Sequence, residues 1–354
     1  MNYPVGVEMS DKYLSFEVTA AAIKLIKDFM LVKAGENVVI TADTSSDRRV
    51  VEALAGAAAA VDANPVIIYY PTSGRAFAEP IRPVADAVLH ADVWIELSYY
   101  CVMHTPCFQK ALENGARFTC LNGMDVTMLV NTVGKVDYDT LIEFGEYLTQ
   151  KVQDADEIII RDKNGTDLRA YNEGRRVKHS GQRAVKKGYP VMLGGQVSWC
   201  PAEETINGTL VFDAALFPPA ELGLLHSIVK LTVKNGRAVN IEGGNDAEIF
   251  SKWLASFHDE NMYRLAHYSL GFNPGVLHAT GRIVEDERIF GCIEFGFGSQ
   301  GKSLMGAFWD AAGHTDGIVS RPTVLLDGAV LEENGIYQDQ KARSFSKALH
   351  VEGY

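Results

Sequence analysis

Asn37-Val38-Val39-Ile40-Thr41 is a short, continuous apolar run, and such a run is typical of a strand that is buried on both faces. Similar runs recur along the first half of the chain, separated by segments with the apolar spacing of helices. The further strands are expected at residues 66–70, 93–97 and 117–121, and the helices at residues 47–61, 81–90 and 106–114. Continuous apolar strands that alternate with helices predict a parallel sheet covered on both faces.

The pattern changes after a helix that is expected at residues 137–153. Short strand-like segments follow, and Lys234-Asn235-Gly236-Arg237 between two of them is a hairpin turn signal. These strands are expected at residues 157–161, 167–171, 209–212, 228–233 and 239–242, with helices at residues 247–257 and 261–268. We therefore predict an α/β N-terminal domain with a parallel sheet (residues 1–154), followed by an α+β C-terminal domain rich in short antiparallel strands (residues 155–354).

The composition argues against several functional classes. The 354 residues include 45 acidic and 33 basic side chains, with a net charge of −12 and no block of Lys and Arg, so we expect no nucleic-acid partner. No apolar run approaches the roughly 20 residues of a membrane span, and the first twenty residues lack the pattern of an export signal. Five cysteines without a CxxC pair favour a reducing, cytoplasmic location. A chain of this class is also expected to form a homo-oligomer.

Two loops of the N-terminal half are candidate ligand sites. No Gly-x-Gly-x-x-Gly fingerprint follows the first strand, so the sequence does not predict a dinucleotide site. Ligands of parallel sheets gather at the carboxyl ends of the strands, which singles out residues 43–46 and 98–104. His104 ends the second loop, where it is a candidate base or an ordinary surface histidine. Cys101 and Cys107, on either side of it, are interpreted as small core side chains.

Gly313-His314-Thr315-Asp316-Gly317 is the strongest local signal for chemistry. In an extended segment, positions i and i+2 point to the same face, so His314 and Asp316 can reach one metal ion. His267 would add a third ligand, and two histidines with one carboxylate form the facial set of non-haem Fe(II) enzymes. Each signal also has an ordinary explanation. A His-x-Asp sequence often lies in a metal-free loop, and His267 lies in an apolar segment where core histidines occur.

From about residue 35 onward, the chain resembles the thermophilic metallo-aminopeptidases (the aminopeptidase T group) and, more closely, their oxygen-using relatives, the 2,5-dihydroxypyridine 5,6-dioxygenases. The resemblance is carried by residues 99–106, 262–275, 291–298 and 313–328. It implies an Fe(II) centre held by His267, His314 and Asp316. It also implies that His104 deprotonates a hydroxyl of the substrate ring, so that O2 can open the ring to an N-formylmaleamate-type product.

Three positions separate the two branches of this resemblance. The peptidases have a Gly-Gly-Glu segment whose glutamate bridges two metal ions, where this chain has Gly194-Gly195-Gln196. A carboxamide carries no negative charge and is a poor bridge. His267 replaces a glutamate of the peptidases, and Glu294 replaces a histidine. These differences remove the two-metal bridge and leave the one-metal set, with Glu294 and Gln196 as candidate neighbours of the metal or the substrate.

Two hypotheses stand beside the iron dioxygenase. One is a metal-dependent aminopeptidase that releases N-terminal residues from peptides, and the other is a binding protein that keeps the fold without the chemistry. His179 lies in a basic patch and is a candidate substrate contact or a solvated loop residue. The dioxygenases carry a His-rich segment a little further on, where this chain has Lys186-Lys187-Gly188-Tyr189-Pro190 and no histidine. Because of this difference, the sequence does not identify which hydroxylated ring is the substrate.

Overall fold

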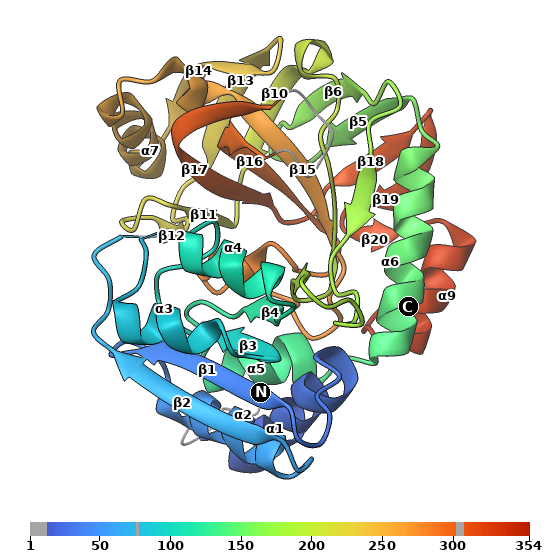
Figure 1. The fold of residues 1–354 in the computed structure, drawn as a ribbon. Coiled ribbons are helices and arrows are strands. Elements are labelled where there is room, and N and C mark those ends of the chain that lie inside the picture. The colour runs from blue at the N-terminus through green and yellow to red at the C-terminus, as the bar shows by residue number, and fades with distance from the viewer. Residues whose placement is uncertain (1–12, 76–77, 302–307) are drawn as a thin grey trace, which may run out of the picture. The chain divides into compact units, whose positions relative to one another are not determined.

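The computed structural model of the chain describes residues 13–75, 78–301 and 308–354. These separate into two compact units, which are Met1–Lys135 with Arg183–Val191, and Val136–Gln182 with Met192–Tyr354 (Figure 1). Most of the stretch in which no export signal is expected lies outside the described residues. The predicted domain boundary after residue 154 stays a prediction. The compact units differ from it because helix α6 (Tyr138–Gln153) packs on strands β7 and β9 and on helix α9, all of the C-terminal unit.

The N-terminal unit contains a parallel sheet, as predicted. Its strand order is β2-β1-β3-β4-β8, and the fifth strand, β8, is absent from the sequence predictions. Helices cover both faces, because α1, α2 and α5 contact one another on one face and α3 and α4 contact one another on the other (Figure 1). The strands are β1 (Asn37–Asp43), β2 (Asn64–Tyr70), β3 (Val93–Glu96), β4 (Arg117–Cys120) and β8 (Pro190–Val191). The helices are α1 (Ser15–Lys24), α2 (Arg48–Ala59), α3 (Arg82–Val88), α4 (Pro106–Glu113) and α5 (Val126–Leu129), with π-helical turns at Leu25–Phe29 and Val130–Gly134.

Trp94 of β3 is at the centre of one core of this sheet. Its indole ring lies edge-on to Phe118 of β4, with ring centroids 4.9 Å apart, and Phe118 makes the same kind of contact with Phe108 of α4. The indole Nε1 donates a hydrogen bond of 2.8 Å to Thr41 Oγ1 of β1, so the buried donor has its partner. This packing fixes α4 on β3 and β4, and it thereby anchors the loop that joins β3 to α4.

The C-terminal unit contains two antiparallel sheets of short strands, as predicted. Their strand orders are β14-β13-β10-β6-β5-β18-β19-β20 and β12-β11-β17-β16-β15-β9-β7. The strands of the first sheet are β5 (Glu157–Arg161), β6 (Asp167–Tyr171), β10 (Asn207–Phe212), β13 (Val229–Lys234), β14 (Arg237–Gly243), β18 (Thr323–Leu326), β19 (Ala329–Glu333) and β20 (Ile336–Tyr337). Those of the second are β7 (Val177–His179), β9 (Gln196–Trp199), β11 (Ala215–Phe217), β12 (Gly223–Leu224), β15 (Leu265–Gly271), β16 (Cys292–Gln300) and β17 (Trp309–Val319). The helices besides α6 are α7 (Asn245–Ser256), α8 (Ile283–Asp286) and α9 (Gln340–Ala348).

Phe212 of β10 joins the two sheets of this unit. Its ring centroid lies 6.4 Å from that of Phe295 and 6.2 Å from that of Phe297, both on β16. Gly317 of β17 faces the same ring, and a Cβ atom at this position would lie 2.5 Å from Phe212 Cζ. The absence of a side chain at Gly317 therefore lets the aromatic ring enter, and the two sheets pack through a common apolar layer.

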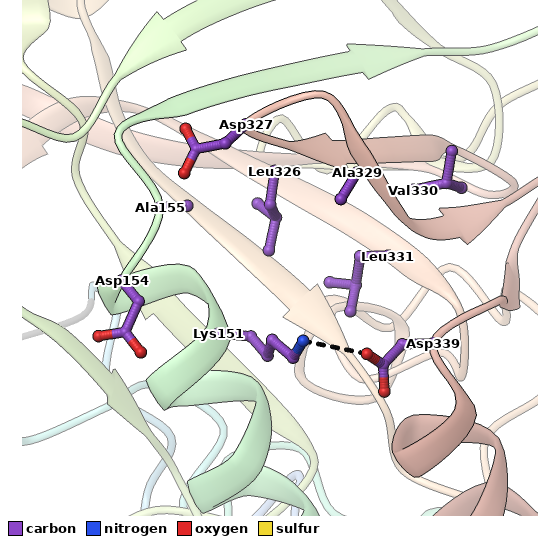
Figure 2. A pocket seen from close by; sticks show the side chains of 9 residues that line it. All are labelled: Lys151, Asp154, Ala155, Leu326, Asp327, Ala329, Val330, Leu331 and Asp339. Carbon is purple, nitrogen blue, oxygen red and sulfur yellow. Dashed lines mark ion pairs between the residues drawn. The ribbon is translucent and has the colours of Figure 1, made fainter.

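Asp339 holds the C-terminal helix α9 against α6. Its carboxylate caps α9 by accepting from the backbone N–H groups of Lys341 and Ala342. It also accepts from Tyr147 Oη at 2.6 Å and pairs with Lys151 Nζ at 3.1 Å (Figure 2). Burial opposes ionisation of Asp339, but these donors outweigh it and lower its pKa to about 2. A cavity of about 190 Å³ lies beside this pair, and none of its lining residues is a candidate site residue.

The helix expected at residues 261–268 is wrong. A short 3-10 turn at Glu260–Tyr263 leads instead into strand β15. Nearly every side chain of β15 is buried, on both faces of the strand, and such a continuous apolar run cannot be told from a buried helix by its periodicity. Among the residues that the structure describes, no helix is both long enough and apolar enough to cross a membrane.

Candidate metal centre

His267, His314 and Asp316 come together on one sheet. His267 lies on β15, and His314 and Asp316 lie two residues apart on β17, with β16 between the two strands. In the register of the sheet, Gly296 of β16 is opposite both His267 and Asp316. One ligand atom from each of the three side chains lies within 4.8 Å of the other two. The geometry therefore brings two imidazoles and one carboxylate to a common point.

Gly296 makes this convergence possible. A Cβ atom at residue 296 would lie 2.2 Å from His267 Cε1 and 2.4 Å from His267 Nδ1. No side chain fits at that distance, so the imidazole of His267 occupies the space above the glycine. The glycine is thus required because another ring lies over it, and residue 296 controls the position of His267 across the strand pair.

The three side chains interact strongly even without a cation. His314 Nε2 lies 3.0 Å and His267 Nε2 3.7 Å from Asp316 Oδ1, and the two imidazole rings are parallel with centroids 5.2 Å apart. Burial opposes ionisation of Asp316, but the adjacent His314 outweighs it and lowers the pKa of Asp316 to about 2. Burial also opposes protonation of His314, but Asp316 outweighs it and raises the pKa of that ring. His267 has a lowered pKa, chiefly because it is buried.

The hydrogen bond of His314 Nδ1 fixes which nitrogen of the ring is available to a cation, whereas Nε2 lies 3.0 Å from Asp316 Oδ1 and donates to it when the ring is protonated. His314 Nδ1 lies 3.0 Å from the backbone carbonyl oxygen of Ser299. A carbonyl oxygen can only accept, so Nδ1 carries the hydrogen and the neutral ring keeps its lone pair on Nε2. Metal-binding histidines commonly have this arrangement, in which an outer carbonyl fixes the tautomer and the ring orientation. The sequence alone did not single out Ser299.

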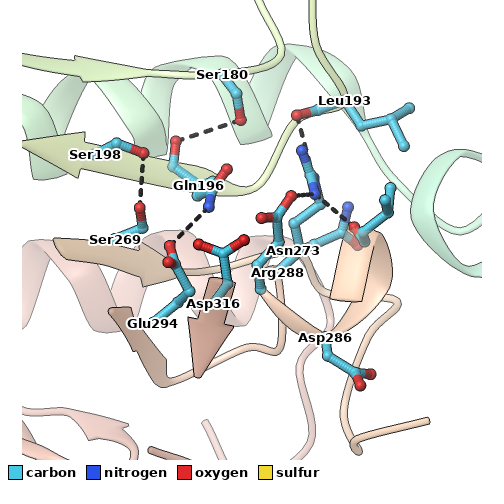
Figure 3. A network of polar contacts seen from close by, with 12 residues as sticks. Ser180, Leu193, Gln196, Ser198, Ser269, Asn273, Asp286, Arg288, Glu294 and Asp316 are labelled. Atoms are coloured by element: carbon cyan, nitrogen blue, oxygen red, sulfur yellow. Dashed lines mark hydrogen bonds and ion pairs between the residues drawn. The ribbon is translucent and has the colours of Figure 1, made fainter. Parts of the chain in front are cut away.

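Glu294 of β16 is a buried carboxylate next to the three candidate ligands. Its Oε1 lies 3.0 Å from His267 Nε2 and accepts no hydrogen bond of ordinary geometry, whereas its Oε2 accepts from Gln196 Nε2 at 3.3 Å (Figure 3). Burial raises the pKa of Glu294 well above its ordinary value, and the charges of Asp316 and Glu287 raise it further. An orphaned buried carboxylate oxygen beside an imidazole suits a site that takes up a cation.

Glu287 and Arg288, which directly follow α8, interact with the centre or its neighbours and are absent from the sequence predictions. Burial raises the pKa of Glu287, which interacts electrostatically with both Asp316 and His267. Arg288 pairs with the Glu287 carboxylate, and its Nε donates to the Leu193 carbonyl at 3.3 Å (Figure 3). Two adjacent opposite charges usually indicate a solvated surface. The only sequence signal against that interpretation is the apolar pair that follows them, Ile289-Phe290.

The remaining candidates are His104 of the N-terminal unit and His179 of the C-terminal unit, and their roles stay predictions. His104 is exposed, adopts a left-handed backbone conformation with φ 68°, and precedes Thr105, which caps α4. His179 of β7 packs on α6, where a Cβ atom at Gly145 would lie 2.7 Å from its Nδ1. Burial lowers the pKa of His179. Its surroundings are therefore those of a packed strand residue.

Comparisons with known proteins give the family and the fold of the chain. The profile of the 2,5-dihydroxypyridine 5,6-dioxygenase family matches residues 23–339. The solved 2,5-dihydroxypyridine dioxygenase from Pseudomonas putida KT2440 is similar at 17% identity with a TM-score of 0.75, covering 95% of this chain and 99% of that chain. AmpT from Thermus thermophilus is similar at 14% identity with a TM-score of 0.66, covering 92% of this chain and 100% of that chain. A search of the curated proteins gives no match.

At these identities the two solved structures show a common fold and nothing more. Fold and family profile together define the class of the protein, which is a ring-cleaving dioxygenase. Because the profile spans most of its length, the chain belongs to the 2,5-dihydroxypyridine 5,6-dioxygenase family. The predicted fold class and family are thereby confirmed, and the dioxygenase hypothesis is favoured over both alternatives.

Replacing Gly296 with alanine tests the role of the glycine. We expect Gly296→Ala to displace the His267 ring, to lower the free energy of unfolding by about 1–3 kcal/mol, as overpacking does, and to abolish high-affinity binding of divalent cations. Urea unfolding and anaerobic isothermal titration with Fe(II) measure the two effects. Gly56→Ala is the matched control, because a Cβ atom at this α2 position meets nothing within 4 Å. Equal cation affinity in the two variants would contradict the prediction.

Proposed function

We propose that the chain is an Fe(II)-dependent dioxygenase that cleaves 2,5-dihydroxypyridine or a close analogue with O2. In this proposal His267, His314 and Asp316 hold the iron. The observation that carries it is the convergence of these three donors within 4.8 Å, from two strands that flank a glycine. Both atoms of O2 enter the product, which is a ring-opened acid amide of the N-formylmaleamate type.

The donor set fits ferrous iron by its chemistry. Two neutral imidazoles and one carboxylate suit Fe(II) and leave coordination positions for other ligands. The orientation of His314 supports this role, because its Nδ1 is engaged by the Ser299 carbonyl, whereas its Nε2 faces Asp316 Oδ1 at 3.0 Å and is the nitrogen that a cation would bind once its proton leaves. The lowered pKa of Asp316 keeps that carboxylate ionised, as a metal ligand must be. Next to these three ligands lies Oε1 of Glu294, which accepts no hydrogen bond of ordinary geometry. It carries negative charge when the carboxyl group is ionised and can hold a proton when it is neutral.

The other residues of the chain are assigned to proton transfer and positioning. Bound Fe(II) supplies the redox chemistry by which O2 reacts with an electron-rich ring. We assign to His104 the removal of the ring hydroxyl proton at an imidazole nitrogen, because an imidazole can accept a proton and His104 is exposed in the loop that follows β3. Glu294 orients the His267 ring through the contact of 3.0 Å between its Oε1 and His267 Nε2, and Gln196 holds Glu294 in place. Arg288 holds Glu287 in turn.

A metal-dependent aminopeptidase is the second candidate. The specific observation in its favour is Glu294, which offers a fourth donor 3.0 Å from His267 Nε2. A two-metal peptidase needs a charged bridge between its ions, and Gln196 carries no charge and donates its amide hydrogen to Glu294. The family profile also favours the oxygenase. We therefore place the peptidase second.

We also propose a cytoplasmic homo-oligomer whose partners are a small aromatic substrate and O2. All five cysteines are free thiols, which suits a reducing compartment. Strand β2 is an edge of the parallel sheet, and its Val66, Ile67 and Tyr69 are exposed. An apolar edge strand of this kind suits pairing with a second copy of the chain.

The iron proposal predicts that each of three alanine substitutions removes both metal and activity. His267→Ala, His314→Ala and Asp316→Ala should each contain almost no iron after anaerobic reconstitution, because each removes one of the three proposed ligands. They should consume no O2 with 2,5-dihydroxypyridine in an oxygen electrode. The control is His226→Ala, which changes an exposed histidine of the same unit and should retain both. Iron-loaded wild-type protein that consumes no O2 with any dihydroxylated pyridine or benzene would refute the proposal. Cleavage of an aminoacyl anilide would support the peptidase.

The role of His104 is tested by separating chemistry from metal binding. His104→Gln should keep its iron but turn over about 10²–10⁴-fold more slowly, which is the usual contribution of a general base. His90→Ala, an exposed histidine of the same N-terminal unit, is the control and should behave as wild type. Normal turnover by His104→Gln would exclude the residue as the base.

The pKa shifts predict how iron binding depends on pH. Iron needs the neutral form of His314, whose pKa is raised by Asp316, so affinity should fall as the pH drops through that raised value. The decrease should approach about tenfold per pH unit, one proton being displaced. Protonation of Asp316 should not contribute to this pH dependence, because its pKa of about 2 keeps the carboxylate ionised over the whole range measured. Anaerobic competition with a chelator, corrected for the chelator's own protonation, measures the affinity. An affinity independent of pH on the acid side of neutrality would contradict this prediction.

A further inference from the structure

A second group of metal-ligating side chains lies in the N-terminal unit, at the carboxyl ends of two neighbouring parallel strands. Glu96 ends β3 and Cys120 ends β4, and the two residues are paired in the register of the sheet. Cys101 lies in the loop that follows β3. The Sγ atoms of Cys101 and Cys120 are 3.7 Å apart, and one carboxylate oxygen of Glu96 lies within 4.8 Å of both.

The Glu96 carboxylate is held in place on one side only. Its Oε1 accepts hydrogen bonds from Ser98 Oγ and, at 2.9 Å, from Asn122 Nδ2. Its Oε2 is buried and accepts no hydrogen bond of ordinary geometry, with the Cys120 thiol and the backbone N–H of Val102 as its neighbours. The whole side chain is excluded from solvent. A buried carboxylate oxygen without a partner is costly, and a cation would remove that cost.

We propose that Glu96, Cys101 and Cys120 bind a thiophilic divalent cation of the zinc type. Two sulfur atoms that each lie about 2.3 Å from a tetrahedral zinc ion are about 3.8 Å apart, close to the separation seen here. Thiolate ligands select zinc-like ions over the hard cations that prefer oxygen. Each thiol gives its proton to solvent on binding, and the cation takes the place of the hydrogen that Cys120 donates to Asn122. Cys101 is only half-buried, which leaves a route for the ion.

Such a cation would act on the loop that carries His104. Glu96 and Cys120 are fixed in the sheet, whereas Cys101 lies in the loop between β3 and α4. A shared ion would therefore tie this loop to two strands, close in sequence to the candidate base. The inference does not depend on the ring-cleaving function, since none of its three ligands belongs to the iron proposal. It also replaces the interpretation of Cys101 as a core side chain.

Co(II) provides a probe that distinguishes the two proposed sites. Cobalt bound to two thiolates gives an intense charge-transfer band in the near ultraviolet, whereas cobalt on histidines and carboxylates alone does not. Anaerobic titration of the full chain with Co(II) should therefore produce this band, and the His267→Ala variant should produce it too. The double variant Cys101→Ser with Cys120→Ser should lose the band. Cys107→Ser is the matched control, because this buried cysteine of the same unit lies outside the cluster.

Two further measurements keep the test decisive if a variant does not fold. Glu96→Gln should keep the band with an affinity lower by at least about tenfold, since losing even an outer hydrogen bond of a metal site costs 10–100-fold. In the wild-type chain, Zn(II) should protect Cys101 from iodoacetamide, as read by mass spectrometry. The proposal is overturned if no band forms, if the band survives in the double serine variant, or if Zn(II) leaves the labelling of Cys101 unchanged. A Cys101–Cys120 disulfide in anaerobically purified protein would overturn it as well.

Discussion

The register of β16 between β15 and β17 is the constraint on which the candidate metal centre depends. A shift of one residue in either pairing would turn His267, or His314 with Asp316, to the opposite face of the sheet. The same register puts Gly296 under the His267 ring, where no other residue has room. Packing between the two sheets fixes this register from the other side, through Phe212 and Gly317.

The centre also gathers like charges in a place that water reaches poorly. The side chain of Glu294 is 0% exposed and that of Asp316 is 16% exposed, and the Glu287 carboxylate interacts with both. Three carboxyl groups and two imidazoles in such a place cost free energy of folding unless protons or a cation compensate them. The protein holds this arrangement with hydrogen bonds from Gln196 and an ion pair from Arg288. Perturbed groups clustered in this way are typical of functional sites.

The two units contribute different kinds of geometry. In the C-terminal unit, the candidate ligands project from adjacent antiparallel strands, which are rigid and hold side chains in fixed positions. In the N-terminal unit, the candidate groups follow the carboxyl ends of parallel strands, where loops are free to vary. His104 and Cys101 belong to one such loop, and Trp94 and Phe108 anchor its two ends. One chain thus combines a set of metal ligands on rigid strands with candidate groups on a loop, and the sequence of that loop can change without moving the strands.

Much of this protein follows from the sequence by itself. The apolar runs that begin at Asn37 determine the parallel sheet, because a strand buried on both faces needs apolar residues throughout. The spacing of His314 and Asp316 determines that both face the same way, because side chains alternate along a strand. Only the tertiary structure decides that His267 joins them, since the pairing of β15 with β16 is a contact between distant segments. For the same reason, local spacing could not indicate that Gly296 makes room for an imidazole, that Ser299 sets the tautomer of His314, or that the Glu287 carboxylate interacts with the centre.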